Sequence, residues 1–261
     1  MIKFFKRAYV FLIIFILYAP IVLLMVFSFN DSKKRSQWSG FTLRWYKDLF
    51  NDPQIKTAFY YTIIVAIVAT IVATIIGTAA AIGIHNMTKW KKNLIMNATY
   101  IPLLSPDIVT GISLMILFIF AKIPRGFYSL LLAHITFSIP YVILSVTPKL
   151  KQLNYNIYEA ALDLGATPFY AFHKVVLPEI MPGITAGALL AFTLSIDDFV
   201  VSFFNTGPAV STLSIEIYSM ARRGINPKIN ALSTIMFSTI LLLLFIVNIG
   251  SAKEAKKPTR A

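Results

Sequence analysis

The chain has 261 residues, of which 57% are hydrophobic and 13% are charged, and its mean hydropathy is +0.72. This composition is typical of a membrane protein and excludes an ordinary soluble domain. The chain has no cysteine, which excludes disulfides, a thiolate nucleophile and a cysteine-based zinc site. The formal net charge is +13. In so apolar a chain, we assign the basic residues to lipid headgroups beside membrane spans, and not to nucleic acid.

A helix that crosses the hydrocarbon core of a bilayer needs about 20 mainly apolar residues. Six segments reach this length, and they predict an all-α integral membrane protein with six transmembrane helices in a single domain over residues 1–261. In chain order, the segments are Ala8–Phe29, Ala58–Ile84, Asn93–Ala121, Phe127–Thr147, Gly183–Asn205 and Ala231–Gly250.

The first segment runs for 22 residues without a charged side chain. A secretory signal has an apolar region of about 7–15 residues followed by a small-residue cleavage site, and this segment has neither feature. We therefore expect an uncleaved span. The tail after Ser251 is short and basic, and we expect it to be disordered.

Three carboxylates interrupt the apolar segments. Asp107 lies in the third, and Asp197 and Asp198 lie in the fifth. Each costs about 2.5–3.5 kcal/mol near a helix centre, so such residues face a bundle interior or a water-filled cavity. Pro102 and Pro106 remove backbone donors just before Asp107, which predicts a kink or a broken helix at that point.

We interpret Asp197 and Asp198 as residues of a substrate path, with the hydroxyls of Ser195 and Thr193 beside them, because two adjacent carboxylates exceed one structural need. Adjacent helical residues point about 100° apart, so only one of the pair can aim straight along the path. The alternative is an Asp that is protonated or paired with Lys or Arg of a partner subunit. For Asp107, capping of a re-entering helix is an equal alternative.

The polar loop 148–182, between the fourth and fifth segments, holds the most specific pattern in the chain. It consists of Glu159-Ala160-Ala161, three residues, Gly165, nine residues, and then Val175-Val176-Leu177-Pro178.

The same loop predicts its own local structure. Tyr158, Ala161 and Leu162 fall on one face of a helix. Gly165 permits a left-handed C-cap, and Thr167-Pro168 is typical of an N-cap followed by proline at the first helical position. We therefore expect two short helices joined at Gly165. An ordinary interfacial linker is the alternative if the full spacing is ignored.

This spacing resembles the "EAA" loop of ATP-binding-cassette importer permeases, a cytoplasmic loop that docks on a separate ATPase subunit. Val175 stands where that family usually has Ile and keeps the β-branched shape. The resemblance implies that the ATPase docks on Glu159, Ala160, Ala161, Gly165, Leu177 and Pro178. It also implies that both termini are cytoplasmic in a bacterial cytoplasmic membrane. Charge alone leaves the orientation open, because 13 Lys and Arg fall on one side and 11 on the other.

Further strings resemble the second permease subunit of bacterial spermidine/putrescine importers, over most of the chain. They include Ser105-Pro106-Asp107-Ile108, His134-Ile135-Thr136-Phe137, Ser195-Ile196-Asp197-Asp198, Thr206-Gly207-Pro208 and Ile217-Tyr218-Ser219-Met220. The resemblance implies a heterodimer with a related permease, two ATPase subunits and an extracytoplasmic polyamine-binding protein. Polyamines carry several ammonium groups, which need oxygen acceptors such as spaced carboxylates.

Aromatic rings can add cation–π contacts of about 0.5–2 kcal/mol to such a cation. Trp45 in the first outer loop and Tyr141 in the fourth segment are candidates, although Trp45 is equally placed to be an interfacial anchor. His134 lacks metal-ligand spacing and is expected to be a packed or hydrogen-bonded polar residue. Glu216 and Arg223 belong to a solvated loop or, alternatively, to a docking surface for the binding protein.

The chain has no P-loop, no H-E-x-x-H and no G-x-S-x-G pattern, so we expect a transport subunit and not an enzyme. No cofactor is expected on this chain, and ATP would be bound by the partner ATPase. The sequence predicts import of polyamines. The alternatives are another cationic or zwitterionic solute and, less favoured, an ion-coupled secondary transporter in which Asp107, Asp197 and Asp198 bind the coupling ion.

Overall fold

The computed structural model describes residues 2–32, 37–223 and 227–255. Within these ranges the chain is helical and contains no strand, apart from an isolated β-bridge between Asn30 and Phe41. It divides into two compact units, residues 1–57 with 216–261 and residues 58–215.

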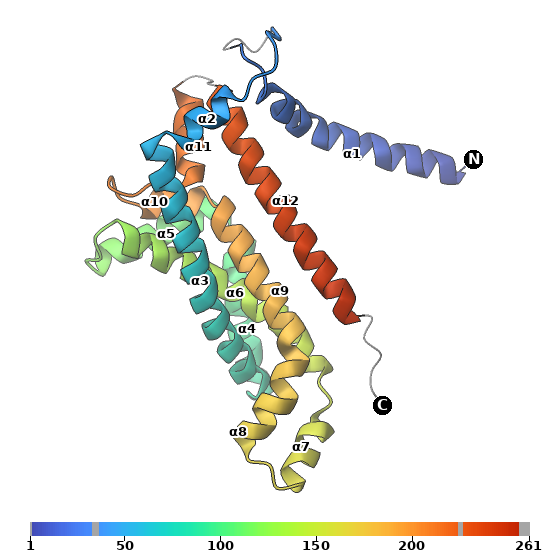
Figure 1. The fold of residues 1–261 in the computed structure, drawn as a ribbon. Helices are drawn as coiled ribbons and strands as arrows, with labels where there is room; N and C mark the ends of the chain where they lie inside the picture. Colours follow the sequence, from blue (N-terminus) through green and yellow to red (C-terminus); the bar gives the residue numbers. More distant parts are fainter. Residues whose placement is uncertain (1, 33–36, 224–226, 256–261) are drawn as a thin grey trace. The chain divides into compact units, whose positions relative to one another are not determined.

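The helices follow one another as Figure 1 shows. Their bounds are α1 Ile2–Phe27, α2 Arg44–Phe50, α3 Pro53–His85, α4 Lys89–Leu104, α5 Asp107–Phe120, α6 Phe127–Gln152, α7 Tyr155–Asp163, α8 Pro168–Ala171, the π-helix η1 Phe172–Val176, α9 Leu177–Asp197, α10 Val200–Asn205, α11 Leu213–Arg222 and α12 Pro227–Ala255.

Several of these helices are long and apolar enough to cross a membrane. Four qualify individually: α1, α3, α6 and the run from α8 through η1 to α9. The pair α4 and α5 qualifies as one broken span. The sixth predicted segment lies in α12, whose described apolar part is Pro227–Leu242. The multi-pass helical architecture is therefore confirmed. Of the tail expected to be disordered, Ser251–Ala255 continues α12, and residues 256–261 lie outside the described ranges.

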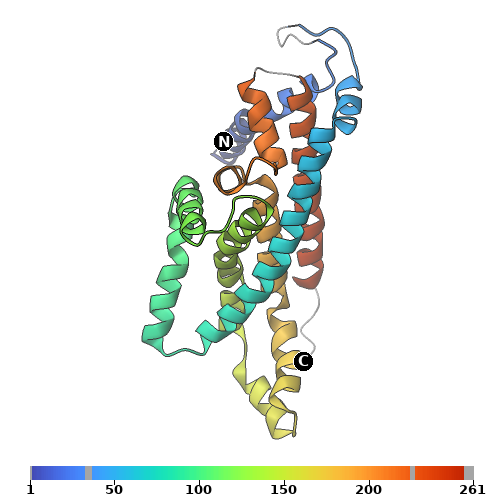
Figure 2. The same cartoon turned by 90° about the vertical axis from the view of Figure 1, so that its left-hand side faces the viewer.

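The predicted break in the third span is confirmed. The axis bends by 109° between the end of α4 at Leu104 and the start of α5 at Asp107, and Figure 2 shows this turn. Ser105 and Pro106 adopt extended backbone angles at the break, with ψ of 142° and 139°. Proline disfavours the α region for the residue before it and has no N–H to continue the ladder. The break leaves Asp107 as the first residue of α5.

The fifth span differs from the prediction of one helix over Gly183–Asn205. The helix α9 ends at Asp197, the chain is extended at Asp198, and α10 is a separate helix of six residues. The cause lies in the Asp198 side chain, which accepts the backbone N–H groups of Val201 and Ser202 at the start of α10. A carboxylate in that position competes with continuation of the helix.

Helices of the second unit approach closely where glycine faces a neighbour. A Cβ atom added at Gly183 would lie 2.8 Å from the Ser145 carbonyl oxygen, and one at Gly187 would lie 3.1 Å from the Val142 Cα atom. A Cβ at Gly77 of α3 would also meet Val142, at 2.7 Å. Small residues at contacts let membrane helices pack by dispersion forces. This packing of α6 against α3 and α9 supports the elements that carry the carboxylates.

Candidate functional site

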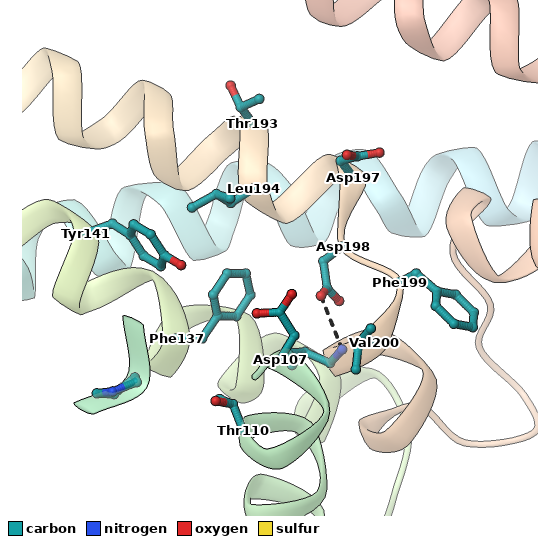
Figure 3. Close-up of a pocket in the computed structure, with 12 residues that line it drawn as sticks. Asp107, Thr110, Phe137, Tyr141, Thr193, Leu194, Asp197, Asp198, Phe199 and Val200 are labelled. Carbon is teal, nitrogen blue, oxygen red and sulfur yellow. Dashed lines mark hydrogen bonds between the residues drawn. The ribbon is translucent and has the colours of Figure 1, made fainter. Parts of the chain in front are cut away.

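The unit of residues 58–215 contains an open cavity of about 340 Å³ where its two broken spans meet (Figure 3). This volume is in the range of ordinary small-molecule sites, roughly 300–1,000 Å³. Residues from α4, α5, α6, α9 and α10 line it: Pro102, Asp107, Thr110, Phe137, Tyr141, Thr193, Leu194, Asp197, Asp198, Phe199, Val200 and Val201. All three carboxylates singled out in the sequence belong to this lining.

The carboxylates are not equivalent. Figure 3 shows Asp198 and Asp107 pointing toward the same space, whereas Asp197 points away from both. Asp197 and Asp107 are exposed, while the Asp198 side chain retains 11% of its accessible surface. This difference follows from the end of α9, because Asp197 is its last residue and Asp198 stands in the extended link. The geometry brings Asp107 and Asp198 together and sets Asp197 at the edge.

Asp198 is held by the first turn of α10. Its Oδ1 accepts the Val201 N–H at 3.1 Å, and its Oδ2 accepts the Ser202 N–H at 2.6 Å. Hydrogen bonds to a carboxylate are stronger than neutral ones, and a helix N-terminus favours negative charge. Asp107, in contrast, makes no side-chain cap bond, since the N-cap position of α5 belongs to Pro106. Asp107 therefore does not act as the N-cap of α5, which was the alternative role considered for it.

Thr110, Phe137 and Tyr141 complete the wall opposite α9. Phe137 and Thr110 were missed in the sequence analysis. Thr110 follows Asp107 by three residues and Phe137 precedes Tyr141 by four, so helical spacing from the chosen residues could have identified them. Oxygen acceptors and aromatic faces thus line one cavity, which is the chemistry that suits an organic cation.

Ser195 is not on the cavity wall, contrary to the sequence interpretation. It is 3% exposed, and its Oγ lies 2.7 Å from Nδ1 of His134. Asp198, three residues later, reaches the cavity from the extended link after α9, whereas the Ser195 hydroxyl is enclosed against His134. The hydroxyl that lines the cavity from α9 belongs to Thr193. His134 is hydrogen-bonded and buried, as the sequence predicted.

Trp45 also occupies a different setting from either role considered for it. Its ring is 3% exposed in the unit of residues 1–57 and 216–261, and its Nε1–H donates to the Asn30 carbonyl oxygen at 2.8 Å. The Arg44 guanidinium lies 5.5 Å from the ring centroid. A ring enclosed in this way stabilises its own loop and offers little face to a cation or to lipid headgroups.

The first half of the polar loop 148–182 folds as the sequence predicted. α7 ends in a Schellman motif, in which Gly165 has φ of +84° and donates to the Leu162 carbonyl, while Ala166 donates to the Ala161 carbonyl. The Thr167 hydroxyl then accepts the Tyr170 N–H, with Pro168 at the first helical position. No atom of the described residues beyond its chain neighbours lies within 4 Å of a Cβ built at Gly165, so the positive φ is the constraint that favours glycine here.

The second helix of the loop is not short, which corrects the sequence prediction. α8 continues through the π-helical turn η1 into α9 without interruption, since Pro178 falls in the first turn of α9. Glu159, Ala160 and Pro178 are exposed, Ala161 and Leu177 are half-buried, and Val176 is 7% exposed. Large apolar side chains protrude beside them: Leu164 at 89%, Phe169 at 80% and Tyr170 at 58% exposure.

No group of three or more His, Cys, Asp or Glu residues suited to a metal ion occurs in the part of the chain that the structure describes.

Residues 73–252 match the family described as binding-protein-dependent transport system inner membrane component. This match spans more than half of the chain. The chain belongs to that family. It is therefore a multi-pass permease subunit of a transport system and not an enzyme. Both carboxylate-bearing breaks and the loop 148–182 fall inside the matched residues, and Trp45 falls outside them.

Two curated relatives of this inner membrane component come from Escherichia coli. The spermidine/putrescine transport system permease protein PotC is 39% identical over 244 residues, which cover 94% of this chain and 91% of PotC. The putrescine transport system permease protein PotI is 38% identical over 251 residues, which cover 94% of this chain and 89% of PotI.

A solved structure supports the same fold. The chain resembles a subunit of a bacterial ABC transporter involved in the import of the acidic polysaccharide alginate, with a TM-score of 0.70. The two share 15% sequence identity over 99% of this chain and 96% of that chain. At this identity the likeness describes the arrangement of helices and says nothing about the substrate.

Proposed function

We propose that this chain is one permease subunit of an ATP-driven importer that moves polyamines, such as putrescine and spermidine, across the cytoplasmic membrane. One observation carries the proposal. Asp107 and Asp198 converge on a single cavity in a chain that is 39% identical, over nearly its full length, to a spermidine/putrescine permease. The alginate importer subunit shares the fold but carries an acidic cargo, so the fold alone does not select a cation.

The cavity has the chemistry that a polyamine requires. Each ammonium group loses water on entering and needs oxygen acceptors in its place. Asp107 and Asp198 supply charged acceptors, and Thr110 and Thr193 also line the cavity. The methylene segments between the ammonium groups would lie against Phe137 and the ring of Tyr141, whose faces also attract cations.

The assembly we propose contains more than this chain. The cavity is open, and two of its carboxylates are exposed, Asp107 and Asp197. A related permease subunit would close the path from the other side and leave these charges facing an enclosed passage. An extracytoplasmic polyamine-binding protein would deliver the substrate.

ATP would be bound by two partner ATPase subunits and not by this chain. The docking surface is the exposed part of α7 and the start of α8, around Glu159 and Gly165. Leu164, Phe169 and Tyr170 provide apolar area there that a soluble partner can bury. This arrangement requires loop 148–182 and both chain termini to be cytoplasmic.

The proposal is tested by uptake in cells that lack their own polyamine importers. The chain is co-expressed with a related permease, an ATPase and a polyamine-binding protein, and entry of labelled putrescine and spermidine is measured. We expect saturable uptake that requires the ATPase and is inhibited by unlabelled polyamine but not by glycine betaine. Uptake of betaine without polyamine would support the other-solute alternative. Uptake that survives an inactive ATPase and is abolished by an uncoupler would support ion coupling.

A further inference from the structure

A buried imidazole bridges the break that carries Asp198. His134, on α6, is 1% exposed, and both of its ring nitrogens are engaged. Its Nδ1 lies 2.7 Å from the Ser195 Oγ, in the last turn of α9, and its Nε2 lies 2.9 Å from the Ser202 Oγ, in the first turn of α10. One side chain therefore connects the helix before the break to the helix after it.

Ser202 links this bridge to the carboxylate. It is fully buried, and its backbone N–H donates to the Asp198 Oδ2 at 2.6 Å. The direct distance from His134 Nε2 to the same oxygen is 3.7 Å, which is too long for a hydrogen bond. Any influence of the imidazole on the carboxylate thus passes through Ser202. His134 itself does not line the cavity.

The surroundings of the imidazole support a fixed orientation. The Phe137 ring packs edge-on against it, with centroids 5.3 Å apart, and Phe137 also lines the cavity. A neutral imidazole donates from one nitrogen and accepts at the other, and each serine hydroxyl can do either. Both serine contacts are therefore satisfied by one neutral ring, and the ring cannot rotate without leaving a buried polar group unpaired.

We propose that His134 is a positioning residue that aims the Asp198 carboxylate into the cavity by holding Ser202. Loss of the imidazole frees the start of α10, and the carboxylate then no longer presents its charge to the cavity. The role in substrate recognition rests on the proposed polyamine function, but the aiming of the carboxylate does not depend on it.

The absence of cysteine from this chain gives a direct test. Thr193→Cys places one thiol on the cavity wall. In the purified complex, its labelling rate is measured with two methanethiosulfonate reagents, one carrying a trimethylammonium group and one neutral. A nearby carboxylate accelerates the cationic reagent selectively. One unit charge about 4 Å away changes such a ratio by about fivefold even in water. Asp198→Asn in the Thr193→Cys chain defines the part of this effect that Asp198 supplies, because Asp107 and Asp197 also line the cavity and keep their charges.

We expect His134→Leu to lower the cationic-to-neutral ratio as much as Asp198→Asn does. Ser202→Ala should do the same, because it removes the Oγ partner of His134 while keeping the backbone N–H. Ser138→Ala is the matched control: Ser138, on α6, is fully buried, but its hydroxyl has no hydrogen-bond partner among the residues that the structure describes, so the ratio should not change. Each variant is compared at equal recovery of the complex with its ATPase.

Two conservative variants identify the atom that matters. The amide nitrogen of Gln can occupy the place of Nε2, and that of Asn the place of Nδ1. His134→Gln should therefore restore the ratio and His134→Asn should not. A normal ratio in His134→Leu and Ser202→Ala, or rescue by Asn and not by Gln, would overturn the proposal.

Polyamine uptake by the same variants separates the two ideas. If the labelling ratio falls and uptake stays normal, the positioning of Asp198 by His134 is supported, and the proposal that polyamines pass through this cavity is contradicted. If the ratio is unchanged while uptake falls at normal recovery of the complex, His134 acts by some other route and the inference is wrong.

Discussion

The backbone N–H of Ser202 donates to the Asp198 carboxylate at 2.6 Å and thereby fixes a negative charge at the break between α9 and α10. A carboxylate inside a membrane protein normally needs a counter-charge or a water-filled cavity. Hydrogen bonds from the N-terminus of α10 partly stabilise the charge of Asp198, and the carboxylate also faces the cavity. The same residue thus ends one helix, begins another and presents an anionic group to the cavity.

Asp198→Asn should reduce polyamine uptake strongly without reducing the amount of the subunit in the membrane. The Asn side-chain oxygen can still accept one of the two N–H groups at the start of α10, so most of the local structure is retained while the charge is lost. A hydrogen bond to a charged group contributes about 1.5–3 kcal/mol, which corresponds to tenfold or more. Labelled uptake and membrane abundance are measured together.

Asp197→Asn is the matched comparison, because Asp197 points away from the shared space. We expect Asp197→Asn to reduce uptake less than Asp198→Asn does. Asp198→Asn should reduce uptake of a longer polyamine more than that of a shorter one, because the longer molecule engages several carboxylates at once. Normal transport by both variants would remove the carboxylate pair from the path. Loss that follows failed assembly with the partner permease would make the pair structural.

Gly165→Arg should uncouple this subunit from its ATPase. A Cβ atom has free space at this position, so the effect comes from the backbone, whose φ of +84° is unfavourable for most L-residues. The Schellman turn would rearrange, and α7 would lose its direction relative to α8. Co-purification of the ATPase and substrate-stimulated ATP hydrolysis are the measurements.

Asn tolerates the left-handed region better than other residues with side chains, so Gly165→Asn is the control for the previous variant. It should retain most coupling. Normal transport and normal ATPase recovery with Gly165→Arg would show that α7 is not the docking helix.

Trp45→Phe should lower the thermal stability of the complex without changing the apparent affinity for substrate. Phe keeps the aromatic volume but leaves the buried Asn30 carbonyl without its donor, at a cost of about 1–3 kcal/mol. Heat-induced loss of the detergent-solubilised complex reports the change. Trp38→Phe serves as the control, because that ring is 53% exposed. A shift in substrate affinity at unchanged stability would restore Trp45 to the substrate path.

The sequence was sufficient for features that depend on local chemistry. Two prolines predicted the break before Asp107, and Gly165 with Thr167 predicted the turn and cap of the docking loop. Apolar length predicted most of the spans. These signals act within a few residues, so no tertiary information was needed to interpret them.

Features that depend on which side a residue faces were not predictable. Ser195 lies next to the carboxylates in sequence, but its hydroxyl is enclosed against His134 and does not line the cavity. α9 ends at Asp197 because Asp198 accepts hydrogen bonds from the start of α10. The sequence prediction treated α9 and α10 as one helix, since both fall in one long apolar segment. The prediction for Trp45 rested on its residue type alone. The hydrogen bond from its ring to the Asn30 carbonyl joins α2 to a preceding loop, and the spacing of apolar residues in the sequence does not reveal such a contact.

Gly183→Val tests whether the close contact of α6 and α9 supports the site. A Cβ at Gly183 would lie 2.8 Å from the Ser145 carbonyl oxygen, and backbone cannot yield as a flexible side chain can. Overpacking of this kind costs about 1–3 kcal/mol or forces the helices apart. Since α9 carries Thr193 and Asp197 and leads into Asp198, separation would distort the cavity wall.

We therefore expect Gly183→Val to reduce both recovery of the complex and uptake, in contrast to Asp198→Asn, which should reduce uptake alone. Gly83→Ala is the control, because Gly83 lies in α3 and has no atom within 4 Å of an added Cβ. Alanine there should be neutral or slightly stabilising, as expected for a helix interior. Normal recovery and uptake with Gly183→Val would mean that α6 and α9 can separate without consequence for the path, and the helix contact would not be what positions the carboxylates.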